Sequence, residues 1–374
     1  MAVKKIGVLT GGGDCPGLNP TIKGVVTRAA DFGIEVLGLQ NGWKSLTGDK
    51  PDAKVLSVDD VRPIIKTGGT ILHTSRTNAY DKSHPEYIKN LEKNVAELGL
   101  DAIVAIGGDD TLSVASRLTK GDLISKPINC VGVPKTMDND VFGTDQCFGF
   151  DTATTLAMDA IERLRDTADS HNRVLILEVF GRKAGWTALY SAIAADADFV
   201  LVPERNPADL EGLFAKLREV RKRRNYALIV VAEGADHPDL DSWADEIAKG
   251  LHGTRLGEAS VEIDSFGHPI LKERRVGDWC AYRINKEMNW DTRVSVMGHL
   301  MRGGQPTLTD RILGARFGVA AAEYVHAEQF GVMAALKGSA IEPFPLEKLT
   351  DDNGKSITRD VTQDWLDFAD VIMK

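Results

Sequence analysis

Short runs of β-branched and other apolar residues recur along the chain, separated by longer stretches in which apolar residues repeat with a helical period. The short runs predict buried parallel strands at Lys5–Thr10, Ile34–Leu39, Ala102–Ile106, Ile128–Val133, Val174–Val179, Phe199–Val202, Ala227–Val231 and Val294–Met297. The helical period predicts helices at Leu18–Ala29, Glu86–Leu98, Thr111–Leu118, Asp151–Ala168, Leu210–Arg223 and Thr309–Tyr324. This alternation favours an α/β protein with helices on both sheet faces and ligands beyond the carboxyl ends of the strands. Ala235–Asn289 lacks a strong period and is interpreted as surface excursions, and the tail from Pro343 is similarly polar.

Composition and charge narrow the possible partners. The chain has 374 residues, 43% of them hydrophobic, which is enough for two domains at ~100 to 200 residues each. Its net charge of −9 argues against nucleic acid or an anionic membrane as partner, and no apolar run approaches the ~18 residues of a membrane span. The scattered cysteines lack CxxC spacing, so we expect neither a zinc site nor disulfides, and a cytoplasmic protein.

Glycine-rich turns follow two predicted strands and lead directly into helices. The first is GGGDCPG at residues 11–17 and the second is GGDDT at residues 107–111. Glycines let backbone N–H groups face a ligand, and a helix N-terminus attracts anions, so both turns are candidates for phosphate binding. The first turn is equally compatible with a tight strand-to-helix connection. In the second, Asp109 is placed to hold Mg²⁺ against bound phosphates, whereas Asp110 or Thr111 is an alternative as a helix cap.

A third predicted strand ends in VPKTMDND, residues 133–140. Asp138 and Asp140 are two residues apart, so both point to one side if the segment is extended. Two carboxylates beside Lys135, Thr136 and an asparagine form a composition typical of phosphoryl transfer, in which one carboxylate accepts the proton of the attacking hydroxyl. The alternative is a turn rich in Asp and Asn.

Arginines and glycines also follow two later strands, in LEVFGRKAGW at residues 177–186 and in Arg302-Gly303-Gly304. In an acidic chain, arginines held at strand ends favour an anion-binding site, because a guanidinium pairs bidentately with phosphate. His299 is a candidate for sugar phosphate binding, although any single arginine or histidine here is compatible with a structural role.

These motifs resemble the phosphofructokinase family, through LTGGGDCPGLN, GGTILHTSR, GGDDT, PKTMDND, LEVFGRKAGW, AEG and RVSVMGHLMRGG, which run in the family's order from Lys4 to Pro343. The resemblance implies two doubly wound α/β domains with the active site in the cleft between them. We expect residues 1–149 with about 301–351 to bind the phosphoryl donor, and about 150–300 with the tail 352–374 to bind fructose 6-phosphate.

The resemblance also implies the reaction, which is Mg²⁺-dependent phosphoryl transfer to the 1-hydroxyl of fructose 6-phosphate. Asp138 is then the general base, Asp140 its neighbour in the loop, and Thr136 lies near the reacting hydroxyl, while Asp109 helps to hold Mg²⁺. The other donor-site residues are glycines that receive phosphates by backbone and arginines that stabilise charge on the transferred group: Gly12, Gly107, Gly108, Arg76 and Arg182.

The sugar phosphate site implied by the resemblance draws on the later motifs. Arg173 and Arg293 contact the 6-phosphate across a subunit interface, which makes a homo-oligomer, dimer or tetramer, an expectation. The other sugar-binding residues are Thr136, Asp138, Phe180, Gly181, Arg182, Glu233, His299 and Arg302.

Two residues bear on the phosphoryl donor. ATP-using members of the family normally carry glycine at the positions of Asp110 and Lys135. A carboxylate at 110 fills the space of the α-phosphate and ribose and repels that phosphate, whereas Lys135 supplies positive charge to a short diphosphate. Both residues resemble the pyrophosphate-dependent branch, which produces fructose 1,6-bisphosphate and phosphate reversibly in glycolysis and gluconeogenesis.

Two other functions remain open from the sequence. One is the same reaction with ATP as donor. The other is a catalytically silent regulatory subunit that binds sugar phosphates, against which the intact Asp138, Asp109 and Arg182 argue.

Overall fold

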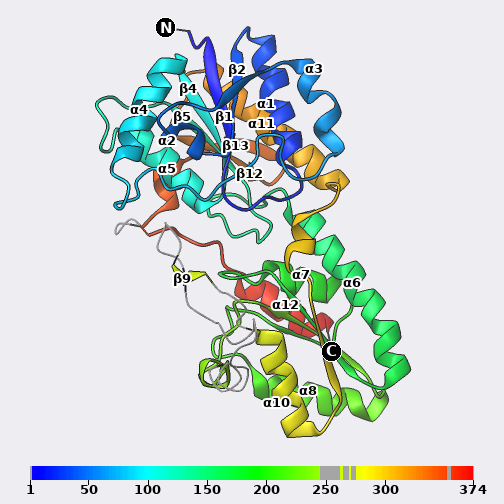
Figure 1. The fold of residues 1–374 in the computed structure, drawn as a ribbon. Helices are drawn as coiled ribbons and strands as arrows, with labels where there is room; N and C mark the ends of the chain where they lie inside the picture. Colours follow the sequence, from blue (N-terminus) through cyan, green and yellow to red (C-terminus); the bar gives the residue numbers. More distant parts are fainter. Residues whose placement is uncertain (1, 245–261, 264–268, 271–274, 352–354, 374) are drawn as a thin grey trace. The chain divides into compact units, whose positions relative to one another are not determined.

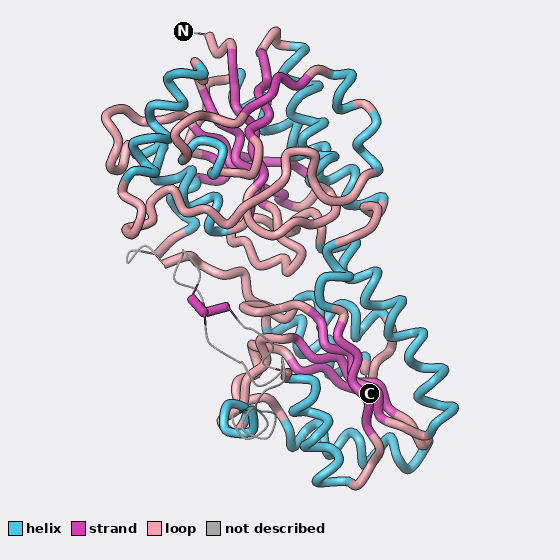
Figure 2. The backbone as a smooth tube through the Cα atoms, viewed as in Figure 1, coloured by secondary structure: helices cyan, strands magenta, loops and turns pink. Residues whose placement is uncertain are grey.

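The computed structural model describes residues 2–244, 262–263, 269–270, 275–351 and 355–373, which form two compact units. Unit 1 consists of Met1–Met137, Val141–Thr152 and Arg302–Ile357, and unit 2 consists of Asp138–Asp140, Ala153–Met301 and Thr358–Lys374. Figure 2 shows the main sheet of each unit in its interior with helices around it. Within the described ranges, no helix is long and apolar enough to cross a membrane.

Unit 1 is built on a seven-stranded mixed sheet in the order β13-β12-β5-β4-β1-β2-β3. Its members are β1 (Lys5–Thr10), β2 (Glu35–Leu39), β3 (Ala53–Leu56), β4 (Ala102–Gly107), β5 (Cys130–Pro134), β12 (Val332–Lys337) and β13 (Ala340–Pro345). The predicted strands of this unit pair in parallel, as expected. Three strands were not predicted: β12 pairs in parallel with β5, and β3 and β13 add antiparallel edges. Because an edge strand has one partner and a partly exposed face, its apolar pattern is weak.

Helices cover both sides of this sheet. Figure 1 shows α1 (Leu18–Asp31) and α11 (Leu308–His326) on one side, and α4 (Glu86–Leu98) and α5 (Asp109–Lys120) on the other. The backbones of α1 and α11 approach closely, since a Cβ added to Gly318 would lie 2.1 Å from the carbonyl oxygen of Thr21. The shorter helical elements are α2 (Lys44–Thr47), α3 (Val58–Val61), η1 (Pro63–Lys66) and η3 (Leu346–Leu349).

Unit 2 has a four-stranded parallel sheet in the order β11-β6-β8-β7. Its strands are β6 (Val174–Val179), β7 (Phe199–Leu201), β8 (Ala227–Ala232) and β11 (Thr292–Val296). The edge strand β11 is only partly buried, contrary to the prediction of a buried strand, because it pairs on one side alone. The remaining elements are α6 (Phe150–His171), α7 (Trp186–Ala194), α8 (Leu210–Arg223), α10 (Val276–Met288), α12 (Gln363–Ile372), η2 (Gly298–Arg302) and the antiparallel pair β9 (Glu262–Ile263) and β10 (Pro269–Ile270).

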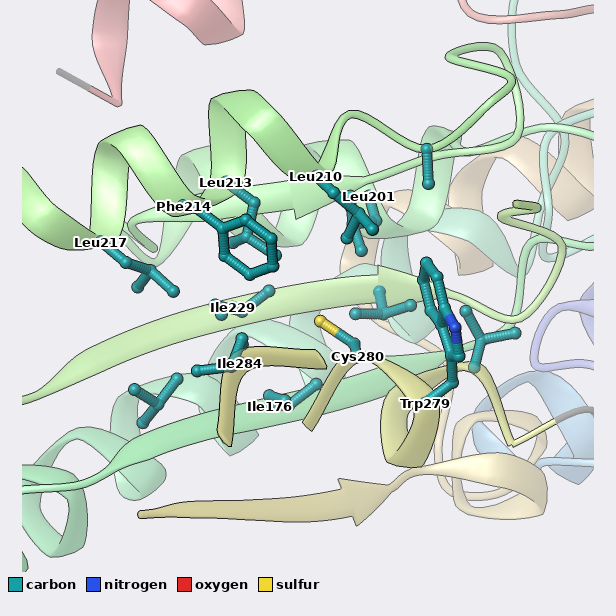
Figure 3. Close-up of a cluster of buried hydrophobic side chains, with 14 of the residues drawn as sticks. Ile176, Leu201, Leu210, Leu213, Phe214, Leu217, Ile229, Trp279, Cys280 and Ile284 are labelled. Carbon is teal, nitrogen blue, oxygen red and sulfur yellow. The ribbon is translucent and has the colours of Figure 1, made fainter. Parts of the chain in front are cut away.

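The interpretation of Ala235–Asn289 as surface excursions is wrong for α10. Figure 3 shows Cys280 and Ile284 of α10 in one cluster with Phe214 of α8 and Ile229 of β8. Trp279, Cys280 and Ile284 are fully buried, whereas the exposed Lys286 and Glu287 that follow them mask the helical period. Most of 245–274 lies outside the described residues.

The boundaries between the units differ from the expected ones at three places, which are residues 138–140, 150–152 and 355–357. Asp138–Asp140 group with unit 2 because the tail residue Arg359 hydrogen-bonds to this segment. Residues 355–357 group with unit 1, since Ile357 N donates to Leu349 O at 2.9 Å. The division of the two substrates between the units stays a prediction.

Candidate functional site

The two glycine turns of unit 1 are packed together around one side chain. A Cβ on Gly11 would lie 2.4 Å from Thr111 Oγ1, and a Cβ on Gly107 would lie 2.3 Å from Thr111 Cβ. The fully buried carboxyl ends of β1 and β4 can therefore approach α5 only because both positions lack a side chain. Packing on Thr111 thus accounts for Gly11 and Gly107 without any ligand.

The next two glycines lie beside cations. Gly12 has a positive φ of 80°, and its N–H donates to Ser75 O at 3.0 Å, so this predicted phosphate donor already has an acceptor within the protein. A Cβ on Gly12 would lie 3.3 Å from Lys135 Nζ, and a Cβ on Gly13 would lie 2.4 Å from Arg302 Nη1. Both glycines therefore keep the loop close to positive charge, which favours an anionic ligand at this loop.

Lys135 joins the two turns. Its side chain is only 5% exposed, and Nζ donates to Gly13 O at 2.5 Å. Its backbone N–H donates to Gly107 O at 3.0 Å. Arg302, which the resemblance assigns to the sugar phosphate, lies in unit 1 and donates from Nη1 to Asp14 O at 3.0 Å. A buried ammonium and a guanidinium at glycine turns form a positive environment of the kind that binds phosphates.

Asp109 and Asp110 form the first turn of α5, next to these cations. The N-cap is Gly108, and Asp109 and Asp110 lie within the first turn of the helix, so the alternative that Asp110 or Thr111 satisfies free N–H groups there stays open. Carboxylate oxygens suit Mg²⁺, which usually takes one or two carboxylates together with substrate phosphates and water. No cluster of three or more potential metal ligands occurs in the described part of the chain. A Mg²⁺ ion at Asp109 would therefore take other ligands from water, backbone or a bound donor.

The loop after β5 is not extended. Asn139 has a φ of 56°, in the left-handed region, so Asp138 and Asp140 are separated by a sharp change of direction. The prediction that both point to one side of an extended segment is therefore wrong. Asn139 is 3% exposed, and Arg359 donates to its carbonyl oxygen from Nη1 at 3.1 Å and to Asp140 O from its backbone N at 2.9 Å.

The predicted sugar-binding residues of unit 2 gather at the carboxyl ends of its strands. Glu233 N donates to Val179 O at 3.0 Å, which places Glu233 beside the loop after β6. In that loop Gly181 has a φ of 136°, and its oxygen accepts from Gly234 N at 3.2 Å. The Phe180 and His299 rings meet edge-to-face with centroids 6.2 Å apart. The carboxyl ends of these strands thus carry four predicted residues: Phe180, Gly181, Glu233 and His299.

Arg173 and Arg293 lie at the other end of that sheet, where strands β6 and β11 begin. Arg173 precedes β6 and binds Asp291 Oδ2 through Nε at 2.5 Å, while Arg293 pairs with Asp291 Oδ1. Burial acts to raise the pKa of Asp291, but hydrogen bonds from both arginines lower it overall. Since β6 spans six residues, this group lies about 20 Å from the other end of the strand.

Three residues that contribute to these loops were missed from the sequence, and they are Thr74, Ser75 and Arg359. Ser75 and Thr74 close the first glycine loop, Thr74 Oγ1 donating to Gly12 O at 2.6 Å, and Arg76 follows them with an exposed side chain. Their motif, GGTILHTSR, was noted for the resemblance but not for this contact. Arg359 carries no periodic or motif signal, because it belongs to a polar tail far along the chain.

The fold and the cationic strand-end residues are typical of α/β proteins that bind phosphorylated ligands. A family model described as phosphofructokinase matches residues 5–325. The chain is 44% identical over 344 residues to a pyrophosphate–fructose 6-phosphate 1-phosphotransferase of Dictyoglomus thermophilum, which covers 92% of both chains. It is also 44% identical over 349 residues to ATP-dependent 6-phosphofructokinase 3 of Streptomyces coelicolor, covering 90% of this chain and 92% of that one.

A crystal structure shares the fold. The pyrophosphate-dependent phosphofructokinase from Marinobacter aquaeolei superposes with a TM-score of 0.74 at 22% identity, covering 99% of this chain and 92% of that chain. The chain belongs to the phosphofructokinase family.

Proposed function

We propose that the protein is a pyrophosphate-dependent 6-phosphofructokinase. It transfers a phosphoryl group from inorganic pyrophosphate to the 1-hydroxyl of fructose 6-phosphate, giving fructose 1,6-bisphosphate and phosphate. The reaction is reversible and serves glycolysis and gluconeogenesis in the cytoplasm. The observation that carries this proposal is the buried Lys135 ammonium, 2.5 Å from Gly13 O and one residue beyond the end of β5. Relatives named for pyrophosphate, such as that of Dictyoglomus thermophilum, support the same donor.

The donor site comprises the two glycine turns and the first turn of α5. Pyrophosphate carries its negative charge on the oxygens of two linked phosphate groups. The Lys135 ammonium offsets this charge. Gly108 and Arg76 contribute a backbone donor and a guanidinium, and Asp109 is the residue that would hold Mg²⁺. When bound, this ion offsets charge on the pyrophosphate and the transferred group.

Asp138 acts as the general base of the proposed reaction. It takes the proton of the 1-hydroxyl as that oxygen attacks the terminal phosphorus of pyrophosphate, and phosphate leaves. Thr136 positions the hydroxyl, Arg182 offsets charge on the transferred phosphoryl group, and Asp140 supports the loop. In the reverse direction, protonated Asp138 returns the proton to the sugar oxygen.

The sugar phosphate occupies the strand ends of unit 2. Glu233 accepts hydrogen bonds from sugar hydroxyls, and the Phe180 and His299 rings, 6.2 Å apart, flank the sugar. Arg302 adds a phosphate contact. Arg173 and Arg293 bind the 6-phosphate of a neighbouring subunit's site, which accounts for their place at the other end of the sheet and requires a homo-oligomer, either dimer or tetramer.

The first experiment compares donors directly. Formation of fructose 1,6-bisphosphate is measured with fructose 6-phosphate and Mg²⁺, supplying pyrophosphate and ATP in parallel. We expect turnover with pyrophosphate alone. Turnover with ATP alone would favour the second candidate, an ATP-dependent 6-phosphofructokinase, which the similarity to the Streptomyces coelicolor relative supports. Inactivity with both donors would favour a regulatory subunit that binds sugar phosphates.

Substitutions at Asp110 and Lys135 test how the protein selects pyrophosphate over ATP. Asp110→Gly opens space and removes charge, whereas Asp110→Asn removes charge and keeps the volume, so the pair separates repulsion from exclusion. We expect the double variant Asp110→Gly, Lys135→Gly to gain ATP turnover and to lose pyrophosphate turnover. Unchanged donor use in the double variant would contradict this account of selection.

A further inference from the structure

We propose that Arg359 is a positioning residue, which holds the loop Asp138–Asp140 in the shape that proton transfer requires and so makes turnover depend on the C-terminal tail. This inference rests on the proposed role of Asp138 as general base. Arg359 lies in the segment between β13 and α12 and, like the loop, belongs to unit 2.

Arg359 binds two successive carbonyl groups of the loop. Its backbone N donates to Asp140 O at 2.9 Å, and its Nη1 donates to Asn139 O at 3.1 Å. Asn139 holds a left-handed conformation, with a φ of 56°, which costs about 1 kcal/mol relative to ordinary backbone. Contacts from outside the loop therefore help to maintain this shape, and Arg359 provides two of them directly after Asp138.

Arg359 is in turn fixed by the first residue of α7. Its guanidinium carbon lies 4.2 Å from the centre of the Trp186 ring, and Trp186 Nε1 donates to Arg359 O at 2.8 Å. Trp186 is 1% exposed, so its ring is a rigid support. Stacking on a buried indole while donating to a carbonyl restricts both the plane and the reach of the guanidinium.

The same tail segment is tied to the loop that carries Arg182. Glu204 Oε1 accepts from Val361 N at 2.9 Å and from Gly185 N at 2.9 Å. The partly buried carboxylate of Glu204 thus bridges the tail to the β6–α7 loop, while Arg359 connects the tail to the Asp138 loop. The segment Arg359–Val361 therefore couples two loops that supply proposed catalytic groups, Asp138 and Arg182.

The rest of the tail offers a matched control. Arg205 pairs with Asp370 in α12 at 2.6 Å. This ion pair attaches the same tail to unit 2 and involves neither the Asp138 loop nor Trp186. Arg205→Ala therefore weakens tail attachment and leaves the loop contacts of Arg359 in place.

The experiment compares Arg359→Met with Arg205→Ala in the full-length protein. Methionine keeps an apolar stem against Trp186 and removes the bond to Asn139 O. We expect Arg359→Met to lower kcat at least about ten-fold, as misplacement of a reacting group does, with KM for pyrophosphate changed less than about two-fold. Arg205→Ala should keep kcat within about two-fold. Trp186→Phe, which keeps an aromatic ring and loses the bond to Arg359 O, should lower kcat in the same direction.

Hydrogen exchange provides a readout that needs no turnover. Amides of residues 138–141 should exchange faster in Arg359→Met than in wild type or in Arg205→Ala. An active wild type combined with unchanged kcat and exchange in Arg359→Met would overturn this inference alone. Equal losses of kcat in Arg359→Met and Arg205→Ala would also overturn it, because the effect would then be general tail attachment. A wild type inactive with both donors would instead overturn the proposed function.

Discussion

At the scale of single residues, the side chain of Thr111 packs directly against both glycine turns. Because a Cβ on Gly11 would lie 2.4 Å from Thr111 Oγ1, we expect Gly11→Ala to lower the free energy of unfolding by about 1–3 kcal/mol. Thr111→Ala removes the obstructing atoms, so the double variant should recover part of that loss. Chemical denaturation of the four proteins in a double-mutant cycle measures this coupling.

Gly48→Ala is the matched control for Gly11→Ala. Gly48 has a φ of −76°, and its added Cβ would meet only Lys50 O at 3.6 Å, so we expect a change within about 0.5 kcal/mol. Additive effects of Gly11→Ala and Thr111→Ala would contradict steric conflict between these two positions.

Asp310 makes stability depend on pH. Burial raises the pKa of this fully buried carboxyl to about 6, although hydrogen bonds from Thr152 N at 2.8 Å and Thr152 Oγ1 at 2.6 Å lower it. An Asp in an unfolded chain titrates near 3.9, so the folded state binds more protons between pH 4 and 6. Asp310 therefore favours folding at low pH, and this contribution is lost as the pH rises through about 6.

Asp310→Asn removes this titration and keeps an oxygen that accepts both bonds. We expect the unfolding free energy of the variant, relative to wild type, to rise by up to about 3 kcal/mol between pH 4 and 7. Denaturation at several pH values measures this difference, in which the other titrating groups cancel. A difference that does not vary with pH would contradict a raised pKa for Asp310.

How far the site is predictable depends on whether neighbouring residues are also near in sequence. The glycine turns and strand-end residues follow from the sequence, because parallel strands bring their carboxyl ends to one edge of a sheet. The shape of the Asp138 loop did not follow, since Asn139 takes a left-handed conformation that asparagine tolerates but does not require. Arg359 was missed because its contacts join residues 220 positions apart.

At the scale of elements, the pattern of apolar residues predicts those strands that are buried on both faces. Central strands such as β4 and β8 are fully buried, and their β-branched runs identify them. Edge strands β3 and β13 pair on one side only, so their weaker patterns went unrecognised. Helix α10 was missed because arginine, lysine and glutamate surround a narrow apolar stripe.

Substitution within α10 tests whether this helix belongs to the core of unit 2. Ile284 is fully buried among residues of α8, β6 and β8, so Ile284→Ala should lower the free energy of unfolding by about 2–5 kcal/mol. Tyr282 lies two residues away on the same helix and is 44% exposed, and Tyr282→Ala should cost about 1 kcal/mol or less. Denaturant unfolding distinguishes the two, and equal effects would indicate a helix that is only loosely attached.

At the scale of the whole molecule, the sheet of unit 2 carries candidate ligand groups at both ends. Glu233 and His299 follow strands, whereas Arg173 and Arg293 share Asp291 at the strand beginnings. One sugar phosphate cannot span the length of β6, about 20 Å, so a single chain does not use both groups in one site. The proposed function therefore needs a second copy to complete each site.

Mixed oligomers test this sharing of sites. Asp138→Asn and Arg293→Ala chains should each have low turnover alone. A hybrid pair holds one site with both substitutions and one with neither, so equal mixing should restore about a quarter of wild-type activity. Arg293→Ala should still fold, because its partner Asp291 is half-exposed and such ion pairs contribute little.

Mixing Asp138→Asn with Arg182→Ala is the control, since both residues serve the site of their own chain and every site stays defective. Recovery in neither mixture, with assembly of hybrids verified by two affinity tags, would show that Arg293 acts within its own chain.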